Sequence, residues 1–307
     1  MRVVSVINYK GGVGKTSTTA NLAAQLAWEG LNVLLIDLDP QTSLTFSFIQ
    51  PEDWTSDLAD GKTIKAWFDS FASGSPMPLE DLIFEPPRVK RRLAGKGKIH
   101  LIASHLGLIN VDLELATELG GANLKQSKAN FLKVHKRLID GISALDQDAF
   151  DVVLMDCPPN FNITTKNAIL ASDSILIPAK PDYLSTLGID YLQRNLRELV
   201  GDYNEYAALD LGVHVEPVSP EILGVVFTMV SFYDGQPIAA ARPFINQTKK
   251  LGIPVFDQPL RDNKTVFADA PQDGIPVVLN KYNNPTHDNV VREIEVFVRQ
   301  FRSALGI

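Results

Sequence analysis

The sequence predicts an α/β fold, a mostly parallel sheet with helices on both faces. Two observations lead to this class. Short apolar, β-branched runs alternate along the chain with segments of helical periodicity, as in sheets whose parallel strands are joined by helices. Four of the six runs also end at polar, proline-rich or glycine-rich turns, where open α/β sheets bind their ligands. The expected strands are residues 3–7, 33–36, 99–102, 152–155, 174–177 and 223–227.

The helical segments follow in order. A first helix is expected from about Thr16 to Trp28. Between residues 50 and 97 the composition changes, with five prolines, few strand signals and one short amphipathic helix around residues 64–71, so we expect an elaboration on the sheet. After Pro285, Thr286 is a candidate N-cap for a last helix. The helical spacing of its apolar residues predicts packing on the sheet; these are Val290, Val291, Ile294, Phe297, Val298, Phe301 and Leu305.

Composition limits the class of protein. A chain of 307 residues that is 45% hydrophobic, with no run of eighteen apolar residues, fits one large α/β domain or two small ones. The first residues go directly into a strand and lack an export signal, so the cytoplasm is the expected compartment. The single cysteine, Cys157, excludes an internal disulfide and the paired-cysteine ligation of an iron–sulfur cluster or Cys-based zinc site. The formal charge of −7 leaves room for a local basic face.

A glycine-rich loop follows the first strand and opens the first helix. It contains Gly11, Gly12, Val13, Gly14 and Lys15, followed by Thr16 and Ser17. Small residues let successive backbone N–H groups turn around an anion, and the helix N-terminus adds partial positive charge. Lys15 is expected to reach the β- and γ-phosphates of a nucleotide, and the Thr16 hydroxyl to bind Mg²⁺. The general pattern has glycine where this chain has Tyr9 and makes no demand at Lys10, so Lys10 is a surplus cation.

Carboxylates follow two of the predicted strands. Asp156 ends the strand 152–155 and is expected to be the second anchor of Mg²⁺. The strand 33–36 ends in a segment with Asp37 and Asp39, which places two more carboxylates at the same edge of the sheet. One of these two is expected to position the attacking water. Strand-end aspartates are also common as helix caps and turn residues, but here they converge with the phosphate loop.

Three motifs occur in order along the chain: Lys10 to Thr16, Asp37 to Gln41, and Asp156 to Asn160. Together they resemble the deviant Walker A ATPases of the ParA/MinD class, and most of all ParA-type partition proteins. The likeness continues through residues 171–178, 183–188 and 224–229, so it covers most of the chain and is weakest over residues 50–97. It implies a single deviant P-loop ATPase domain over residues 1–307, with a divergent elaboration at about 50–97.

The resemblance also implies a mechanism. ATP and Mg²⁺ would be the cofactors, and ATP would drive formation of a homodimer in which Lys10 of each subunit reaches the phosphates held by the other. The nucleotide-binding set would be residues 10–17, with Lys10, Lys15 and Asp39 catalytic. Asp39 would orient the hydrolytic water, and Thr16, Asp39 and Asp156 would form the metal site. Residues 39–42 and 157–160 would be the two switch segments, with Cys157 interpreted as a small buried residue.

The partners follow from the same resemblance. It implies nonspecific double-stranded DNA, an activating protein of the ParB type and association with the nucleoid. No residues precede the first strand to form an operator-binding domain, so DNA contacts would be sequence-independent phosphate contacts. Two basic clusters are candidates for them. The first comprises Arg88, Lys90, Arg91, Arg92, Lys96 and Lys98, and the second comprises Arg242, Lys249, Lys250, Arg261 and Lys264.

Two alternative functions stay open at this point. One is a membrane-cycling regulator similar to MinD, although MinD-type proteins end in a short basic helix that lies on the membrane, whereas the last helix here carries Glu293 and Glu295. We therefore expect no membrane partner. The other is an ATP-dependent amidase or ligase of the same fold that acts on a small molecule. The segment Asp37 to Gln41 fits that class less well. The cargo could be a plasmid, a chromosome origin or a protein assembly.

Overall fold

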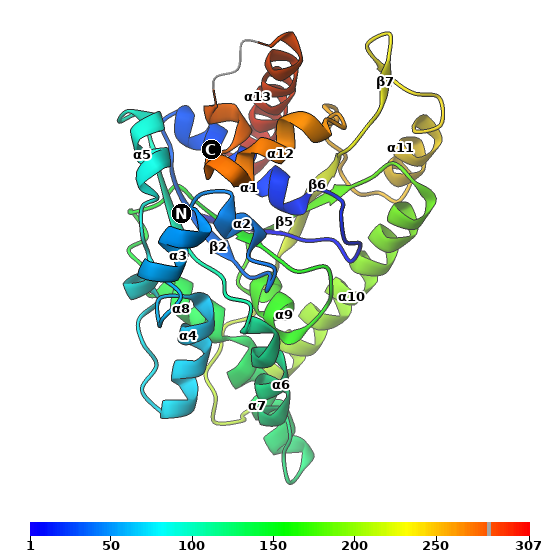
Figure 1. Cartoon of the computed structure of the whole chain (residues 1–307). Helices are drawn as coiled ribbons and strands as arrows, with labels where there is room; N and C mark the ends of the chain where they lie inside the picture. The colour runs from blue at the N-terminus through cyan, green and yellow to red at the C-terminus, as the bar shows by residue number, and fades with distance from the viewer. Residues whose placement is uncertain (281–283) are drawn as a thin grey trace.

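A computed structural model describes residues 1–280 and 284–307 of the chain. Its centre is a six-stranded sheet in the order β3-β2-β4-β1-β5-β6, in which every pairing is parallel (Figure 1). All six predicted strands are present, so the expected α/β class is confirmed. Their bounds are Arg2–Val6 (β1), Asn32–Asp37 (β2), Lys98–Ile102 (β3), Val152–Asp156 (β4), Ser174–Ala179 (β5) and Glu221–Phe227 (β6).

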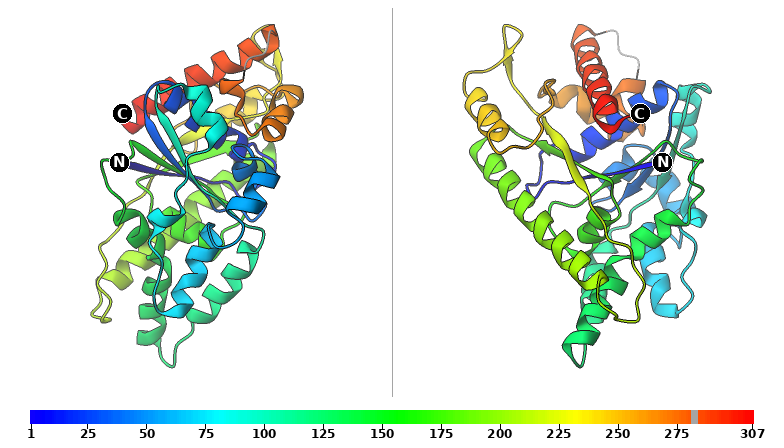
Figure 2. Two further views of the ribbon diagram at one scale, coloured as in Figure 1. Left: turned by 60° about the vertical axis from the view of Figure 1, so that its left-hand side comes forward. Right: turned by 180° about the vertical axis from the view of Figure 1, so that it is seen from behind.

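Helices cover both faces of the sheet (Figure 2). Alternate strand residues point to opposite faces, so Val4 and Val6 pack into one helical layer while Val3 packs into the other. The first layer contains α1 (Lys15–Trp28), α5 (Pro87–Leu93), α12 (Lys264–Asp273) and α13 (Pro285–Leu305). The second contains α4 (Ile64–Ser70), α6 (Leu108–Glu118), α7 (Leu124–His135), α8 (Arg137–Ser143), α9 (Ile163–Leu170) and α10 (Tyr183–Ala207). Further elements are α2 (Ser43–Phe46), β7 (Phe232–Tyr233), β8 (Gln236–Pro237) and α11 (Arg242–Lys249).

The segment between residues 50 and 97 contains more helix than the sequence pattern indicated. The expected helix is present as α4, but α3 (Pro51–Asp57) and α5 also form, so the prediction of a single short helix is wrong. The reason is that α3 buries none of its residues and α5 buries only Val89 and Leu93, which leaves little apolar periodicity to detect. Phe84 pairs with Leu101 of the edge strand β3. The elaboration therefore covers one edge of the sheet.

The last helix packs as expected, but its cap differs from the prediction. The seven apolar positions lie on α13, and six of them, all except Val291, are buried against the layer that contains α1. The N-cap is Asn284, whose side-chain oxygen accepts a hydrogen bond from the Thr286 N–H at 2.8 Å. Thr286 is therefore inside the helix, because Pro285 occupies the first helical position, where its missing N–H costs nothing.

A buried histidine predicts how stability depends on pH. His135 ends α7, is 1% exposed, and burial lowers its pKa from the ordinary 6.5 to about 4. The folded state keeps the ring neutral while the unfolded state takes up a proton below about pH 6.5, so this contribution is lost as the pH falls from 6.5 towards 4. Between pH 7.5 and 4.5 we expect the wild type to lose ~2 kcal/mol more unfolding free energy than His135→Gln, measured by urea denaturation. Equal losses would contradict this.

Candidate nucleotide site

The phosphate loop joins β1 to α1 at the edge of the sheet where the parallel strands end. Gly12 and Gly14 have φ angles of +65° and +78°, in a region of backbone conformation that residues other than glycine rarely adopt. Gly14 is also the N-cap of α1. Val13 between them is fully buried, and its carbonyl accepts a hydrogen bond from the Thr228 hydroxyl at 2.6 Å. The loop is thus fixed to the end of β6, with its glycines arranged as the sequence pattern requires.

Lys15, Thr16 and Asp156 lie together at the start of α1. The Thr16 hydroxyl donates a 2.7 Å hydrogen bond to Asp156, which is fully buried at the end of β4. Burial raises the pKa of Asp156 to about 7, although the hydrogen bond from Thr16 and the charge of Lys15 both act to lower it. Burial also lowers the pKa of Lys15, which the charges of Asp156 and Asp39 oppose. A buried cation facing carboxylates is what a site for a metal-bound polyphosphate needs.

The two aspartates after β2 have different surroundings. Asp37 is fully buried and accepts hydrogen bonds from the Thr45 N–H and hydroxyl at 2.8 and 2.7 Å, and burial raises its pKa to about 8. Asp39 is 9% exposed; its carboxylate accepts from the Gln41 N–H at 2.9 Å and its carbonyl from the Ser104 hydroxyl at 2.8 Å. Asp37 therefore stabilises the turn. Asp39, whose carboxylate has free acceptor capacity, stays the predicted residue for orienting water.

The surplus lysine is paired within its own chain. The Lys10 ammonium lies 2.6 Å from a carboxylate oxygen of Asp182, and the Lys10 N–H donates to the Asn8 side chain at 2.9 Å. Asn8 in turn donates to the carbonyl of Pro178 in the neighbouring strand β5 at 2.8 Å. That Lys10 contacts the phosphates of a second subunit stays a prediction. To do so, the Lys10 side chain would have to leave its ion pair with Asp182.

Tyr9, where the general motif has glycine, is held by aromatic contacts on two sides. Its ring lies 5.7 Å from that of Phe161 and 5.8 Å from that of Tyr191, measured between ring centres. The Asn195 amide also donates a 2.6 Å hydrogen bond to its hydroxyl. These contacts connect the loop to the segment after β4 and to α10. Cys157 in that segment is fully buried and burial raises the pKa of its thiol, so the interpretation as a small buried residue is confirmed.

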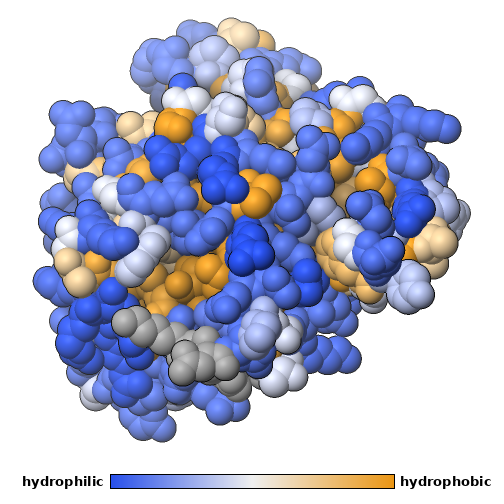
Figure 3. Space-filling model, turned by 90° about the horizontal axis from the view of Figure 1, so that it is seen from above, coloured by the Kyte–Doolittle hydropathy of each residue, from blue (hydrophilic) through white to orange (hydrophobic). Residues whose placement is uncertain are grey.

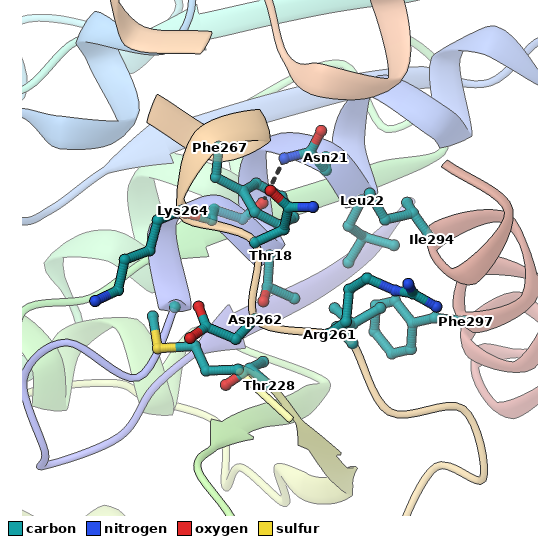
Figure 4. Close-up of a pocket in the computed structure, with 15 residues that line it drawn as sticks. Thr18, Asn21, Leu22, Thr228, Arg261, Asp262, Lys264, Phe267, Ile294 and Phe297 are labelled. Carbon is teal, nitrogen blue, oxygen red and sulfur yellow. Dashed lines mark hydrogen bonds between the residues drawn. The ribbon is translucent and has the colours of Figure 1, made fainter. Parts of the chain in front are cut away.

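A mostly apolar cavity of about 270 Å³ lies beside the loop, between α1, α12 and α13 (Figure 4). One side comes from the loop and α1, through Gly14, Ser17 and Thr18, and the other from Phe267 and Phe297. Sequence reasoning missed this cavity, because its walls come from segments that are far apart in the chain and carry no local motif. Its position next to the phosphate loop suits the planar base of a nucleotide.

In both basic clusters, several of the cationic side chains already have partners within the chain. In the first, Arg88 donates to Gln50, and the Lys96 ammonium lies over the Trp28 ring. In the second, Arg261 forms a two-point ion pair with Glu293 at 2.6 and 2.9 Å, so it does not belong to a free basic surface. Lys249 and Lys250 at the end of α11 are exposed, and the Lys249 ammonium lies 3.7 Å from a carboxylate oxygen of Asp257. The face over α12 and α13 is mainly hydrophilic, with apolar side chains gathered near its middle (Figure 3).

The donor set fits magnesium bound together with a nucleotide. Among the described residues, no group of three or more His, Cys, Asp or Glu side chains could hold a metal ion alone. Mg²⁺ is usually bound by one or two protein ligands plus phosphate oxygens and water, and Thr16 and Asp156 supply such a pair. When bound, the ion would neutralise charge that develops on the phosphates.

The sequence of this chain matches known proteins along most of its length. A family model described as AAA domain matches residues 1–208. The chain is 29% identical over 282 residues to the chromosome partitioning protein ParA of Caulobacter vibrioides, which covers 91% of this chain and 87% of ParA. The chain belongs to this family, as a ParA-type ATPase. ATP and Mg²⁺ remain the cofactors that the sequence predicts for this ParA-type ATPase.

Solved structures have the same fold. Apo McdA of Cyanothece aligns with this ParA-type ATPase over all of both chains, with a TM-score of 0.68 and 20% identity. A cobyrinic acid a,c-diamide synthase of Mycobacterium smegmatis, bound to an ATP analogue and magnesium, aligns over 86% of each chain with a TM-score of 0.63 and 24% identity. At these identities the likeness supports the fold alone. Within the described part of this ParA-type ATPase, no helix has the length and apolar character needed to cross a membrane.

Proposed function

We propose that this chain is an ATP-dependent dimerising switch that positions DNA or another cargo. The observation that carries the proposal is the position of Lys10, a cation that the loop pattern does not require: it lies in the loop after β1, and its side chain is 33% exposed. A cation that stabilises charge on another subunit's phosphates acts as an arginine finger does. We further propose that residues 1–307 form one domain, in which residues 50–97 cover the edge strand β3.

Exposed apolar side chains at the same edge of the sheet support a second copy of the chain as the occupant of this edge. Leu106, Ile109 and Leu113, in and just before α6, are exposed, and so are Tyr183, Leu187 and Tyr191 on α10. Both helices start at the edge of the sheet that carries the loop. Large exposed apolar groups are typical of interfaces, and a twofold dimer would bury both sets around the two nucleotides.

The proposed chemistry assigns a role to each residue. The loop from Lys10 to Ser17 binds the phosphates, Lys15 compensates their charge, and the cavity next to it takes the base. Thr16, Asp39 and Asp156 form the metal site, and Asp39 also orients the water. Hydrolysis, stimulated by an activating protein of the ParB type, would then release the dimer. We place this cycle in the cytoplasm, on the nucleoid.

We propose that DNA binds at the second basic cluster, and we predict ATP-dependent, salt-sensitive binding. Lys249 and Lys250 are exposed at the end of α11, the helix that follows the hairpin of β7 and β8 along the chain. The double variant Lys249→Glu/Lys250→Glu should weaken binding to nonspecific duplex DNA at least ~10-fold and reduce the slope of log affinity against log salt by about two, because each lysine releases a counterion. Fluorescence anisotropy with ATP, ADP and no nucleotide, from 50 to 200 mM salt, measures both.

The matched control is the double variant Lys90→Glu/Arg92→Glu on α5, which makes the same charge change in the first basic cluster. It should bind DNA as the wild type does. If the α5 variant lost binding and the α11 variant did not, the first cluster would be the DNA site. Absence of binding in every nucleotide state would contradict the DNA proposal and favour a small-molecule substrate, and pelleting with liposomes and ATP would favour the membrane alternative.

A further inference from the structure

Ser104 joins the proposed water-orienting aspartate to the segment between residues 50 and 97. It is fully buried just after β3, and its hydroxyl donates a 2.8 Å hydrogen bond to the Asp39 carbonyl. The Ser104 carbonyl in turn accepts a 3.2 Å hydrogen bond from the Trp54 indole N–H on α3. We propose that Ser104 is a positioning residue for Asp39 and that Trp54 holds Ser104 in place, so that the elaboration sets the rate of ATP hydrolysis. The inference rests on the proposed function and adds its regulation.

The sheet brings Ser104 and Asp39 together although they are 65 positions apart in the sequence. Strands β2 and β3 are neighbours, and Ile36 pairs with Ile102, so the segments that follow these two strands leave the sheet side by side. Asp39 lies three positions after Ile36, and Ser104 lies two positions after Ile102. The segment after β3 therefore helps to set where the Asp39 backbone lies.

The turn that carries Asp39 needs support from outside. Thr42, at the end of this turn, has a φ angle of +55°, a backbone conformation that a β-branched residue rarely adopts. The Thr42 N–H closes the turn by donating to the Asp39 carbonyl at 2.9 Å, and the same carbonyl accepts the Ser104 hydroxyl. Backbone strain of this kind persists only where surrounding contacts fix the conformation. The Ser104 hydroxyl is one such contact.

The backbone of Ser104 is fixed on one side by the strand-end motif itself. Its N–H donates to the Thr45 hydroxyl at 3.0 Å, and that hydroxyl donates to the Asp37 carboxylate at 2.7 Å. Both Thr45 and Asp37 are fully buried, so this side of the network is rigid. Any adjustment of Ser104 must therefore come from its other side, where the Trp54 indole binds its carbonyl.

The Trp54 side is the adjustable end of the network. Trp54 is partly buried, and α3, which carries it, has no fully buried residue. Its ring contacts those of Phe46 and His105, with ring centres 5.7 and 5.5 Å away. An element with so little buried surface opens more easily than the central sheet does. A shift of α3 would release the Ser104 carbonyl and loosen the hold on Asp39.

The variant Ser104→Ala tests the contact with Asp39. Alanine removes the hydroxyl, but the Asp39 carbonyl keeps the Thr42 N–H as a partner. We expect kcat for ATP hydrolysis to fall about tenfold, because misplacing a group that orients a reactant is costly even when the displacement is small. The dissociation constant of Mg·ATP should stay within twofold of the wild type. Steady-state ATPase assays and calorimetry measure the two quantities.

Ser172→Ala is the matched control. Ser172 is also a buried serine whose hydroxyl donates to a backbone carbonyl, that of Ala168 at 2.7 Å. It lies just before β5, at the opposite edge of the sheet from the phosphate loop. This variant should keep the wild-type kcat, so that loss of a buried hydroxyl alone does not explain a fall in Ser104→Ala.

Trp54→Phe tests the contact from the elaboration. Phenylalanine keeps an aromatic ring against Phe46 and His105 but removes the N–H that binds Ser104. We expect kcat to fall about threefold, again with little change in the affinity for Mg·ATP. The same change should have no further effect in the Ser104→Ala background, because it acts through the Ser104 hydroxyl. If Ser104→Ala is unfolded by circular dichroism, Trp54→Phe decides the question alone.

The Asp39→Ala background separates this inference from the proposed function. In single-turnover hydrolysis, neither Ser104→Ala nor Trp54→Phe should lower the rate further in that background, and an equal fall there would overturn the inference. A wild-type kcat in both single variants would also overturn it, and would leave the ATPase switch intact provided that Asp39→Ala stops hydrolysis. If Asp39→Ala hydrolyses ATP at the wild-type rate, the proposed role of Asp39 fails as well.

Discussion

Lys15→Ala is expected to abolish nucleotide binding. The Lys15 side chain is 7% exposed and faces the carboxylates of Asp156 and Asp39, so its loss leaves two acidic groups without a counter-charge where a polyphosphate must bind. Charge-assisted hydrogen bonds in a desolvated site are the strong ones, and we expect the dissociation constant of Mg·ATP to rise at least ~100-fold, or about 2.7 kcal/mol. Isothermal titration calorimetry with a nonhydrolysable ATP analogue measures this.

Lys136→Ala is the matched control for this change. Lys136 is a partly buried lysine that pairs with an aspartate, Asp140, but it lies between α7 and α8 on the other side of the sheet. Its loss should leave nucleotide affinity within twofold of the wild type. Retention of ATP binding by Lys15→Ala, with the variant folded by circular dichroism, would contradict the assignment of the loop.

Asp39→Ala should separate binding from hydrolysis. If Asp39 orients the attacking water, its loss should lower the steady-state ATPase rate by ~100-fold or more, the usual scale for removing a group that acts in general base catalysis. ATP binding should persist because Lys15, Thr16 and Asp156 remain. The ATP-bound dimer should then accumulate, and size-exclusion chromatography with light scattering would detect it. Unchanged hydrolysis would move the water-orienting role elsewhere in the site.

Asp37→Ala provides the contrast for the same segment. Asp37 is fully buried and accepts hydrogen bonds from Thr45 and from the Asp39 N–H at 3.1 Å, so its removal leaves these donors unpaired. We expect it to lower the melting temperature through a loss of ~1–3 kcal/mol, whereas Asp39→Ala should melt close to the wild type. The two aspartates are two positions apart in the motif but have separable effects.

The sequence was sufficient where the physical signal is local. Buried parallel strands are continuous apolar runs, and a phosphate loop must place glycines, a lysine and a hydroxyl at fixed spacing, so all six strands and the loop could be predicted. Helices α3 and α5 were not predicted, because few of their residues are buried and their apolar periodicity is weak. The cavity beside the loop was not predicted, because residues such as Thr228 and Phe267, which line it, are far apart in the sequence and meet only in the folded chain.

Charge was the least predictable property. Arg261 belongs to a cluster that is basic in sequence, but its guanidinium forms an ion pair with Glu293. The Lys10 ammonium forms an ion pair with Asp182 in the same way. Neither partner is near in sequence, so no reading of local charge could have found them. Asp37 and Asp39 likewise have the same residue type at the same edge, and only their burial and hydrogen bonds separate a structural role from a candidate catalytic one.

The aromatic contacts of Tyr9 have a consequence for how the molecule would report its state. The Tyr9 ring contacts Phe161 edge to face and Tyr191 at a tilt, so a displacement of the loop relative to the segment after β4 or to α10 would change these contacts. If nucleotide binding displaces the loop, the ring protons of Tyr9 should show it by NMR through ring-current shifts, with no added label. A residue that departs from the general loop pattern thereby makes the state of the loop observable.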